Sequence, residues 1–250
     1  MSAPRAIVVK APGTNCELES RDALRVAGAE ADIVTTAELY REPERLLAAR
    51  ILLLPGGFAH GDDVASARIL ANQMATRLGD VLRRFVDDEE GLVLGICNGF
   101  QALVKLGLLP RAPGEPLRQR VSLVHNASGR YECRWVRLRV EDGPCRFLPR
   151  GTTLEMPVGH GEGKLVFAED WGAAGSVALR YVDADGRATD GYPANPNGSL
   201  DAIAGLTDAT GRVLGLMPHP DRSYLPWHHP RHHPEPGGAV LFRHLVETAR

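Results

Sequence analysis

The sequence predicts an α/β fold, with a single open, mostly parallel sheet flanked by helices and a small antiparallel insertion. Three observations lead to this prediction. Short apolar runs alternate with helical patterns through the first half of the 250 residues. Residues 51–54 are continuously apolar, as in a strand buried on both faces of a parallel sheet. Residues 134–140 alternate charged and apolar side chains, which is typical of a half-exposed antiparallel strand.

The predicted elements follow one another along the chain. In the parallel part we expect strands at 6–9, 31–34, 51–54 and 92–94, and helices at 17–27, 68–86 and 99–106. After it we expect strands at 134–140, 177–182, 201–206 and 213–217, a loop rich in Pro and His at 226–238, and a helix at 238–248. The chain shows no internal repeat and no obvious linker, so we expect one domain over residues 1–250.

Composition excludes several classes of function. The formal net charge is −2, from 29 Lys and Arg against 31 Asp and Glu, so we expect neither nucleic acid nor a membrane as a partner. No apolar run reaches the roughly 18 residues of a membrane span, and the first residues lack the apolar core of about 7–15 residues of a signal peptide. We therefore expect a cytoplasmic protein.

The four cysteines include one that stands out. They are Cys16, Cys97, Cys133 and Cys145, and none of them forms a C-x-x-C pair, so a zinc ribbon or a redox pair is not expected. Cys16, Cys133 and Cys145 are interpreted as small buried side chains. Cys97 differs, because Gly95-Ile96-Cys97-Asn98-Gly99 stands between a buried strand and a helix. This pattern predicts a nucleophile elbow, in which a tight turn exposes the thiol at a helix N-terminus that favours the thiolate.

A cysteine nucleophile needs a base, and the base needs a group that orients it. His219 follows the last predicted strand, so we expect it at the same edge of the sheet as Cys97, with Asp221 two residues further on. An oxyanion hole needs two N–H donors. We expect one from the amide of Asn98 and the other from the glycine-rich segment Pro55-Gly56-Gly57-Phe58, where a backbone amide can face a ligand.

Taken together, these motifs resemble those of the class I, triad-type glutamine amidotransferases, which have a flavodoxin-like sheet. In finer detail they resemble the glutaminase subunits of phosphoribosylformylglycinamidine synthase. The segments that carry this resemblance run in family order through most of the chain. They are Pro12–Cys16, Pro55–Phe58, Gly95–Gln101, Cys133–Val136, His160–Gly163, Asn195–Ser199 and Gly215–Pro220.

The resemblance implies an activity and a set of site residues. Cys97, His219 and Asp221 would be catalytic, whereas Gly57, Phe58, Asn98, Gln101 and His160 would bind the substrate, glutamine. The thioester formed on Cys97 would be hydrolysed, and the ammonia would pass to a synthetase subunit that converts formylglycinamide ribonucleotide to the amidine in purine biosynthesis. A small accessory subunit is expected as well. No cofactor or metal is expected in this chain, and ATP and magnesium would bind to the synthetase.

Some features depart from this pattern or allow other interpretations. The family usually has glutamate where this chain has Asp221, whose shorter side chain must still reach His219. Four histidines within residues 226–238 are interpreted as part of a solvated loop rather than a metal site. Residues 159–165 match a phosphate-binding loop only loosely. One alternative is an α/β-hydrolase, but there the acid stands between the nucleophile and the histidine in the sequence, whereas here it follows the histidine. Another is a scaffold subunit without activity, but such a subunit would not need an intact Cys97 and His219.

Overall fold

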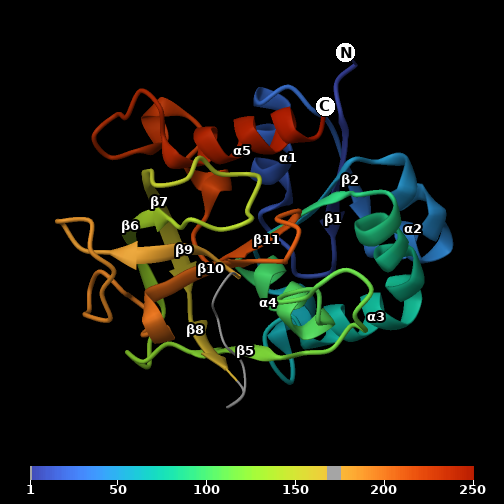
Figure 1. Cartoon of the computed structure of the whole chain (residues 1–250). Coiled ribbons are helices and arrows are strands. Elements are labelled where there is room, and N and C mark those ends of the chain that lie inside the picture. The colour runs from blue at the N-terminus through green and yellow to red at the C-terminus, as the bar shows by residue number, and fades with distance from the viewer. Residues whose placement is uncertain (1, 168–175) are drawn as a thin grey trace.

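The computed structural model describes residues 2–167 and 176–250, in which nine strands form one sheet with helices on both faces (Figure 1). The strand order is β2-β1-β3-β4-β11-β10-β9-β6-β7. The predicted fold class is confirmed, with one difference in detail. The predicted small antiparallel part is present as the separate pair β5 and β8, and four further antiparallel strands extend the main sheet.

One end of the sheet is parallel and supplies the strand ends at which the predicted motifs lie. Its strands are β2 (Glu30–Thr35), β1 (Arg5–Lys10), β3 (Ile51–Leu54), β4 (Leu92–Ile96) and β11 (Val213–Leu216). β3, β4 and β11 are buried along their whole length, which explains their continuous apolar runs. β11 comes late in the chain but pairs in parallel with β4, with Leu216 opposite Ile96. The segments after these two strands therefore leave the same edge of the sheet.

The other end of the main sheet is antiparallel. Its strands are β10 (Ile203–Thr207), β9 (Val177–Val182), β6 (Glu132–Val140) and β7 (Thr153–His160), and β5 (Val121–His125) pairs with β8 (Glu162–Phe167). The sequence predicted β6, β9 and β10 but not β5, β7 or β8. β10 begins two residues later than predicted, because residues 200–202 form a turn in which Asp201 has a φ of 53°.

Helices cover both faces of the sheet. α1 (Glu17–Val26) packs against α5 (Gly237–Thr248) on one face, and α3 (Arg68–Arg83) packs against α4 (Asn98–Leu106) on the other (Figure 1). The short α2 (Thr36–Arg41), which the sequence pattern did not reveal, begins at a capping box made by Thr35 and Glu38. α3 continues into a π turn over residues 84–88, in agreement with the predicted helix 68–86.

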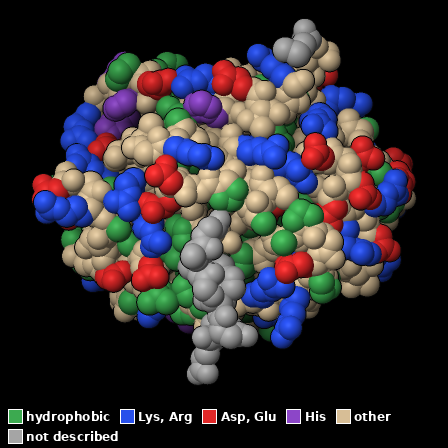
Figure 2. Space-filling model, in the orientation of Figure 1, with side chains coloured by type: hydrophobic (Ala, Val, Ile, Leu, Met, Phe, Trp, Pro, Cys, Tyr) green, Lys and Arg blue, Asp and Glu red, His purple; other side chains and the backbone are tan. Residues whose placement is uncertain are grey.

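The surface matches the balanced composition. On the face shown in Figure 2, cationic and anionic side chains are interspersed. Among the described residues, no helix is both long enough and apolar enough to span a bilayer.

The loop at 226–238 is anchored more firmly than predicted. The ring of His229 is buried and lies edge-on to Trp135, with 4.6 Å between ring centroids. Its Nε2 lies 2.8 Å from a carboxylate oxygen of Glu155 on β7. The interpretation as a wholly solvated loop is therefore wrong for His229, which holds the loop against the antiparallel strands. His232 and His233 are exposed, as expected.

Candidate active site

Cys97 lies in a strained turn between β4 and α4. Its φ of 51° and ψ of −103° are unfavourable for a residue with a side chain, which is the backbone geometry expected of a nucleophile elbow. The flanking glycines are required there. A Cβ atom on Gly95 would lie 2.8 Å from the carbonyl oxygen of Gly99, and one on Gly99 would collide with the backbone of Leu54. The Sγ atom of Cys97 lies 3.7 Å from the carbonyl oxygen of Gly159.

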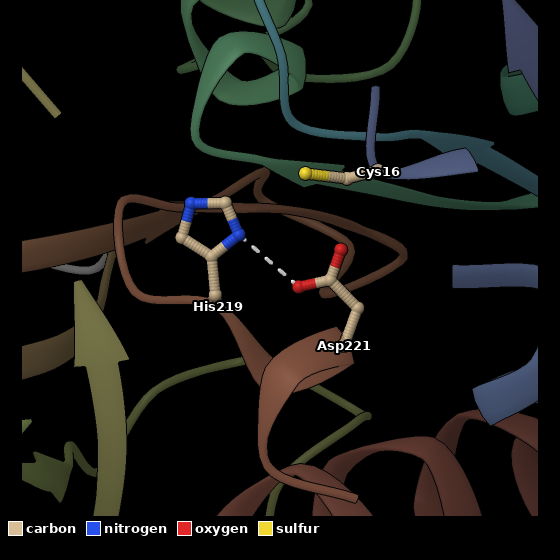
Figure 3. A group of neighbouring side chains, drawn as sticks. All are labelled: Cys16, His219 and Asp221. Carbon is tan, nitrogen blue, oxygen red and sulfur yellow. Dashed lines mark hydrogen bonds and ion pairs between the residues drawn. The ribbon is translucent and has the colours of Figure 1, made fainter. Parts of the chain in front are cut away.

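His219 and Asp221 follow β11, at the predicted edge of the sheet. Nδ1 of His219 donates to Oδ1 of Asp221 over 3.2 Å, so the shorter carboxylate does reach the imidazole (Figure 3). Asp221 is fully buried, and its Oδ2 accepts a hydrogen bond of 2.9 Å from Ser20 of α1. This fixes a proton on Nδ1 and leaves Nε2 buried without a partner in the described part of the chain. Nε2 is therefore the nitrogen that can exchange a proton with a thiol.

The electrostatic surroundings favour a charged imidazole. Burial by itself lowers the pKa of His219, but negative charge at Cys97, followed by the hydrogen bond and charge of Asp221, outweighs it. The pKa of His219 therefore lies well above its ordinary value. Such an imidazole suits a histidine that takes the proton of a cysteine nucleophile.

Two backbone amides are free to act as oxyanion donors. Asn98 is the first residue of α4, so its amide has no acceptor within the helix. The amide of Gly57 makes no hydrogen bond within the described residues. The carbonyl of Gly56 accepts from the amide of Cys16 over 3.3 Å, and in a trans peptide this directs the Gly57 N–H to the opposite side. Gly57 has a φ of 144°, and a Cβ atom there would lie 2.8 Å from the amide nitrogen of Asn15.

A cavity of about 250 Å³ joins most of the predicted residues. Of these, Cys97, His219, Gly57, Phe58, Gln101 and His160 all line it. Asn98 and Asp221 do not line it. Asp221 lies behind the imidazole, and the side chain of Asn98 lies beneath the cavity. The structure therefore brings all eight predicted residues to one place, in two layers.

The side chains of Asn98 and Gln101 are held within the protein. Asn98 accepts from the amide of Ala59 over 3.0 Å and donates to Asp62 and Gln101 over 2.9 and 2.8 Å. Gln101 in turn donates to the carbonyl oxygen of Glu162 over 2.6 Å. These bonds connect the turn after Cys97 to the loop after β3 and to the β7–β8 corner. The side chains of Asn98 and Gln101 thus position the walls of the cavity, and Gln101 also lines it.

His160 lies at the end of β7 and is almost completely buried. Its Nδ1 donates to Oδ1 of Asn126 over 3.1 Å, since the amide nitrogen of Asn126 is already occupied by two carbonyl groups. Burial, and then the neighbouring His219, lowers the pKa of His160 to about 4. His160 is therefore neutral at physiological pH, and its Nε2 has no partner among the described residues.

The sequence did not reveal the roles of Cys16 and Arg222 in this cavity. Cys16 is buried as predicted, but its thiol lies beside His219 and Asp221 (Figure 3). Arg222 donates to Sγ of Cys16 over 3.0 Å, and both side chains line the cavity. One signal was available, because Cys16 follows β1 and Arg222 follows Asp221, both at the edge that carries Cys97. The same interpretation is wrong for Cys133, which is exposed, and right for Cys145, which is buried.

Cys16, His219 and Asp221 are also the one group of three potential metal ligands found among the described residues, with ligand atoms within 4.8 Å of one another. Two hydrogen bonds oppose a cation there. The guanidinium of Arg222 donates to Sγ of Cys16, and Ser20 donates to Asp221. A metal ion would have to displace both donors and approach a fixed positive charge. The donor set therefore suits proton transfer better than metal binding.

Comparisons with known proteins agree with this geometry. Residues 3–247 match the family model of the CobB/CobQ-like glutamine amidotransferase domain. The chain is 41% identical over 258 residues to phosphoribosylformylglycinamidine synthase subunit PurQ of Dehalococcoides mccartyi, covering all of this chain and 99% of that one. It is 37% identical over 243 residues to the human phosphoribosylformylglycinamidine synthase, covering 90% of this chain but 18% of the human protein.

A solved structure is similar over the whole length. A chain in the structure of PurLQS from Thermotoga maritima superposes with a TM-score of 0.74 at 29% identity, covering 99% of this chain and 100% of that one. The sequence match, the structural match and the arrangement of Cys97, His219 and Asp221 point to one conclusion. The chain belongs to the family of CobB/CobQ-like glutamine amidotransferase domains, and within that family it groups with the PurQ subunits of phosphoribosylformylglycinamidine synthase.

Proposed function

We propose that this chain is the glutaminase subunit of a phosphoribosylformylglycinamidine synthase. It hydrolyses glutamine through a thioester on Cys97 and supplies the ammonia to a synthetase subunit. The observation that carries the proposal is the arrangement of one cavity. A thiol on a strained turn and an imidazole held by a buried carboxylate leave two adjacent parallel strands at the same edge.

The first half of the reaction forms the thioester. His219 takes the thiol proton on Nε2, and the sulfur of Cys97 attacks the carboxamide carbon of glutamine, whose C=O π electrons move to oxygen. The amides of Asn98 and Gly57 donate to the resulting oxyanion. When the C=O bond re-forms, the C–N bond breaks, and the proton on His219 goes to the leaving nitrogen, which departs as ammonia.

The second half regenerates the thiol. A water molecule gives a proton to His219 and attacks the thioester carbon, and the same two amides stabilise the second oxyanion. Collapse breaks the C–S bond, glutamate leaves, and the proton returns to Cys97. Throughout both steps Asp221 holds the imidazole with its proton on Nδ1 and stabilises the imidazolium, a role that a buried carboxylate performs in other triads.

Two relatives support a proposal about the partners. The similar chain of Thermotoga maritima was solved as part of PurLQS, and the human relative carries the matching region within a much longer chain. We therefore propose that a synthetase subunit, with a small accessory subunit, accepts the ammonia and converts formylglycinamide ribonucleotide to the amidine. In this proposal ATP and magnesium belong to the synthetase.

The test compares two nitrogen sources in the reconstituted complex. In a Cys97→Ala complex we expect glutamine-dependent synthesis to be lost and ammonia-dependent synthesis to be retained, because only the first requires the thiol. Cys133→Ala, which removes an exposed thiol on β6, is the matched control and should leave both activities unchanged. Equal loss of both activities in Cys97→Ala would show that Cys97 supports the assembly of the complex and not glutamine hydrolysis.

A further inference from the structure

Arg222 is the one Lys or Arg side chain among the residues that line the cavity containing Cys97. It comes directly after Asp221, in the short turn Pro220–Arg222, and about two-fifths of its side chain is exposed. The mechanism above assigns it no role. The proposed substrate, glutamine, is a small zwitterion that must reach Cys97. The positive charge of Arg222 near this thiol therefore requires an explanation.

The guanidinium of Arg222 is held in place, yet its charge is left largely available. Nη2 donates to Sγ of Cys16 over 3.0 Å, and Nε lies 3.7 Å from a carboxylate oxygen of Glu19. Burial raises the pKa of the Cys16 thiol, so this acceptor remains neutral and does not cancel the positive charge. Within the described part of the chain, Nη1 has no hydrogen-bond partner.

The free edge of Arg222 lies close to the nucleophile. A Cβ atom on Gly159 would be 3.6 Å from Nη1 of Arg222, and the carbonyl oxygen of the same glycine is 3.7 Å from Sγ of Cys97. One residue of β7 therefore separates the guanidinium from the thiol. In glutamine, two methylenes and the α-carbon stand between the α-carboxylate and the reacting amide carbon.

Two acidic side chains also line the cavity. Asp62 and Glu162 line it on the side of Gln101, and Glu162 accepts a hydrogen bond from Ser66. Burial raises the pKa of Asp62, so a positive charge placed beside its carboxylate would be favourable. A zwitterion thus has one favoured orientation, with its carboxylate at Arg222 and its ammonium group towards the two acids.

We propose that Arg222 binds the α-carboxylate of glutamine and that Cys16 is the positioning residue that holds the guanidinium in place. This inference rests on the proposed glutaminase function and names a specificity determinant of the same cavity. It also accounts for the second thiol. A thiol accepts a weak hydrogen bond without forming a salt bridge, whereas a carboxylate at position 16 would neutralise the charge that the substrate needs.

The test uses two substrates that differ in one group. We would measure kcat/KM in the assembled complex for L-glutamine and for γ-aminobutyramide, which is glutamine without its α-carboxylate. Arg222→Met should lower kcat/KM for glutamine about 10- to 100-fold, the range for losing a hydrogen bond between charged groups, and should leave γ-aminobutyramide unchanged. Arg222→Lys should recover part of the loss. Arg130→Met, which removes a charge from an exposed side chain outside the cavity, is the matched control.

A second readout does not depend on turnover. A diazoketone analogue of glutamine carries the α-carboxylate, whereas iodoacetamide does not, and mass spectrometry can follow the labelling of Cys97 by each. Arg222→Met should slow labelling by the analogue and leave labelling by iodoacetamide unchanged. Equal slowing with both reagents, or equal losses with both substrates, would show that Arg222 supports the triad and would overturn the proposal. Absence of any glutamine hydrolysis or labelling of Cys97 in the wild type would instead overturn the proposed function.

Discussion

Replacing Asp221 with asparagine removes the negative charge behind His219 and leaves a side chain of nearly the same shape. The carboxylate is fully buried, and both of its oxygens are bonded, Oδ1 to Nδ1 of His219 over 3.2 Å and Oδ2 to Ser20 over 2.9 Å. Asparagine can keep this geometry. Its carbonyl oxygen can accept from Nδ1, and its NH₂ group can donate to the hydroxyl of Ser20. The imidazole therefore keeps the correct tautomer, and the change isolates the charge.

The magnitude follows from the burial of the pair. When His219 takes the thiol proton, it becomes a cation with almost no access to water, and Asp221 is its buried counter-charge. Removing one member of a buried pair costs about 3–5 kcal/mol, but the retained hydrogen bond returns part of that, so we take about 2–4 kcal/mol. At 1.36 kcal/mol for each tenfold, turnover should fall about 30- to 1,000-fold. The same Asp→Asn change in a serine triad lowers turnover roughly 10⁴-fold, because there the asparagine imposes the wrong tautomer on the histidine. We expect a smaller loss here.

The assay is steady-state glutaminase activity of the assembled complex as a function of pH. Because Asp221 raises the pKa of His219, Asp221→Asn should lower that pKa, and His219 should lose its proton at lower pH than in the wild type. Ser20→Ala should cost less than tenfold by itself. In the Asp221→Asn background it should cost more, because the asparagine then loses the hydroxyl that orients it.

Two results would refute this reasoning. Full activity in Asp221→Asn would remove Asp221 from the triad and leave a pair of Cys97 and His219. A loss of activity with an unchanged pH profile would show that the carboxylate supports the fold of the turn and does not act on the imidazole. Ammonia-dependent synthesis, measured on the same complexes, separates either result from a failure of the subunits to assemble.

Three further predictions follow from the packing and charges at the site. Asp221→Glu adds a methylene to a fully buried side chain whose two oxygens are already bonded. It should lower glutaminase activity, and it should lower the melting temperature through a loss of about 1–3 kcal/mol in stability. A gain in activity would contradict this prediction. Gly57→Ala places a Cβ atom 2.8 Å from the backbone nitrogen of Asn15, so it should displace the amide proposed to bind the oxyanion and lower kcat about 10²- to 10³-fold. Gly79→Ala, on an open helix surface, is the control and should leave kcat unchanged. The pKa of about 4 for His160 lies below the unfolded value of 6.5, so the stability that its neutral form contributes is present above pH 6.5 and is lost as the pH falls towards 4. Urea unfolding at pH 7.5 and pH 5 should therefore show about 2 kcal/mol less acid destabilisation in His160→Asn than in the wild type. Equal acid destabilisation in His160→Asn and wild type would contradict the assigned pKa.

The elements that the sequence predicted best are those with a strong local cause. β3, β4 and β11 are apolar runs, and parallel strands bring their carboxyl ends to one edge of the sheet. From the sequence alone, this rule predicts that Cys97 and His219 lie at the same edge of the sheet. It could not place Arg222, because the direction of that side chain depends on the short turn after Pro220 and on a thiol contributed by another strand end.

The unpredicted strands lack such a local signal. β7 contains a proline and a glycine near its end, two residues that are normally depleted in strands, and it is stable because β6 pairs with it along eight residues. β8 contains an acid, a lysine and a glycine and pairs with β5 outside the main sheet. The anchoring of His229 also has no local signal, because its partners Trp135 and Glu155 lie on two strands that are far away in the sequence. Tertiary pairing determined these features, and periodicity alone could not show them.

The antiparallel half of the sheet does more than extend it, because it also positions His219, the proposed base. The amide of His219 donates to the carbonyl oxygen of Pro157 on β7 over 2.8 Å, and the amide of Met217 donates to Ala204 on β10 over 3.0 Å. The position of Cys97 thus depends on β4 in the parallel half, and that of His219 depends on strands of both halves. Neither half could form the cavity alone, since β7 also supplies Gly159 and His160 to its wall. For this reason we propose that residues 1–250 form a single domain, in which a change in β7 would also change the position of His219.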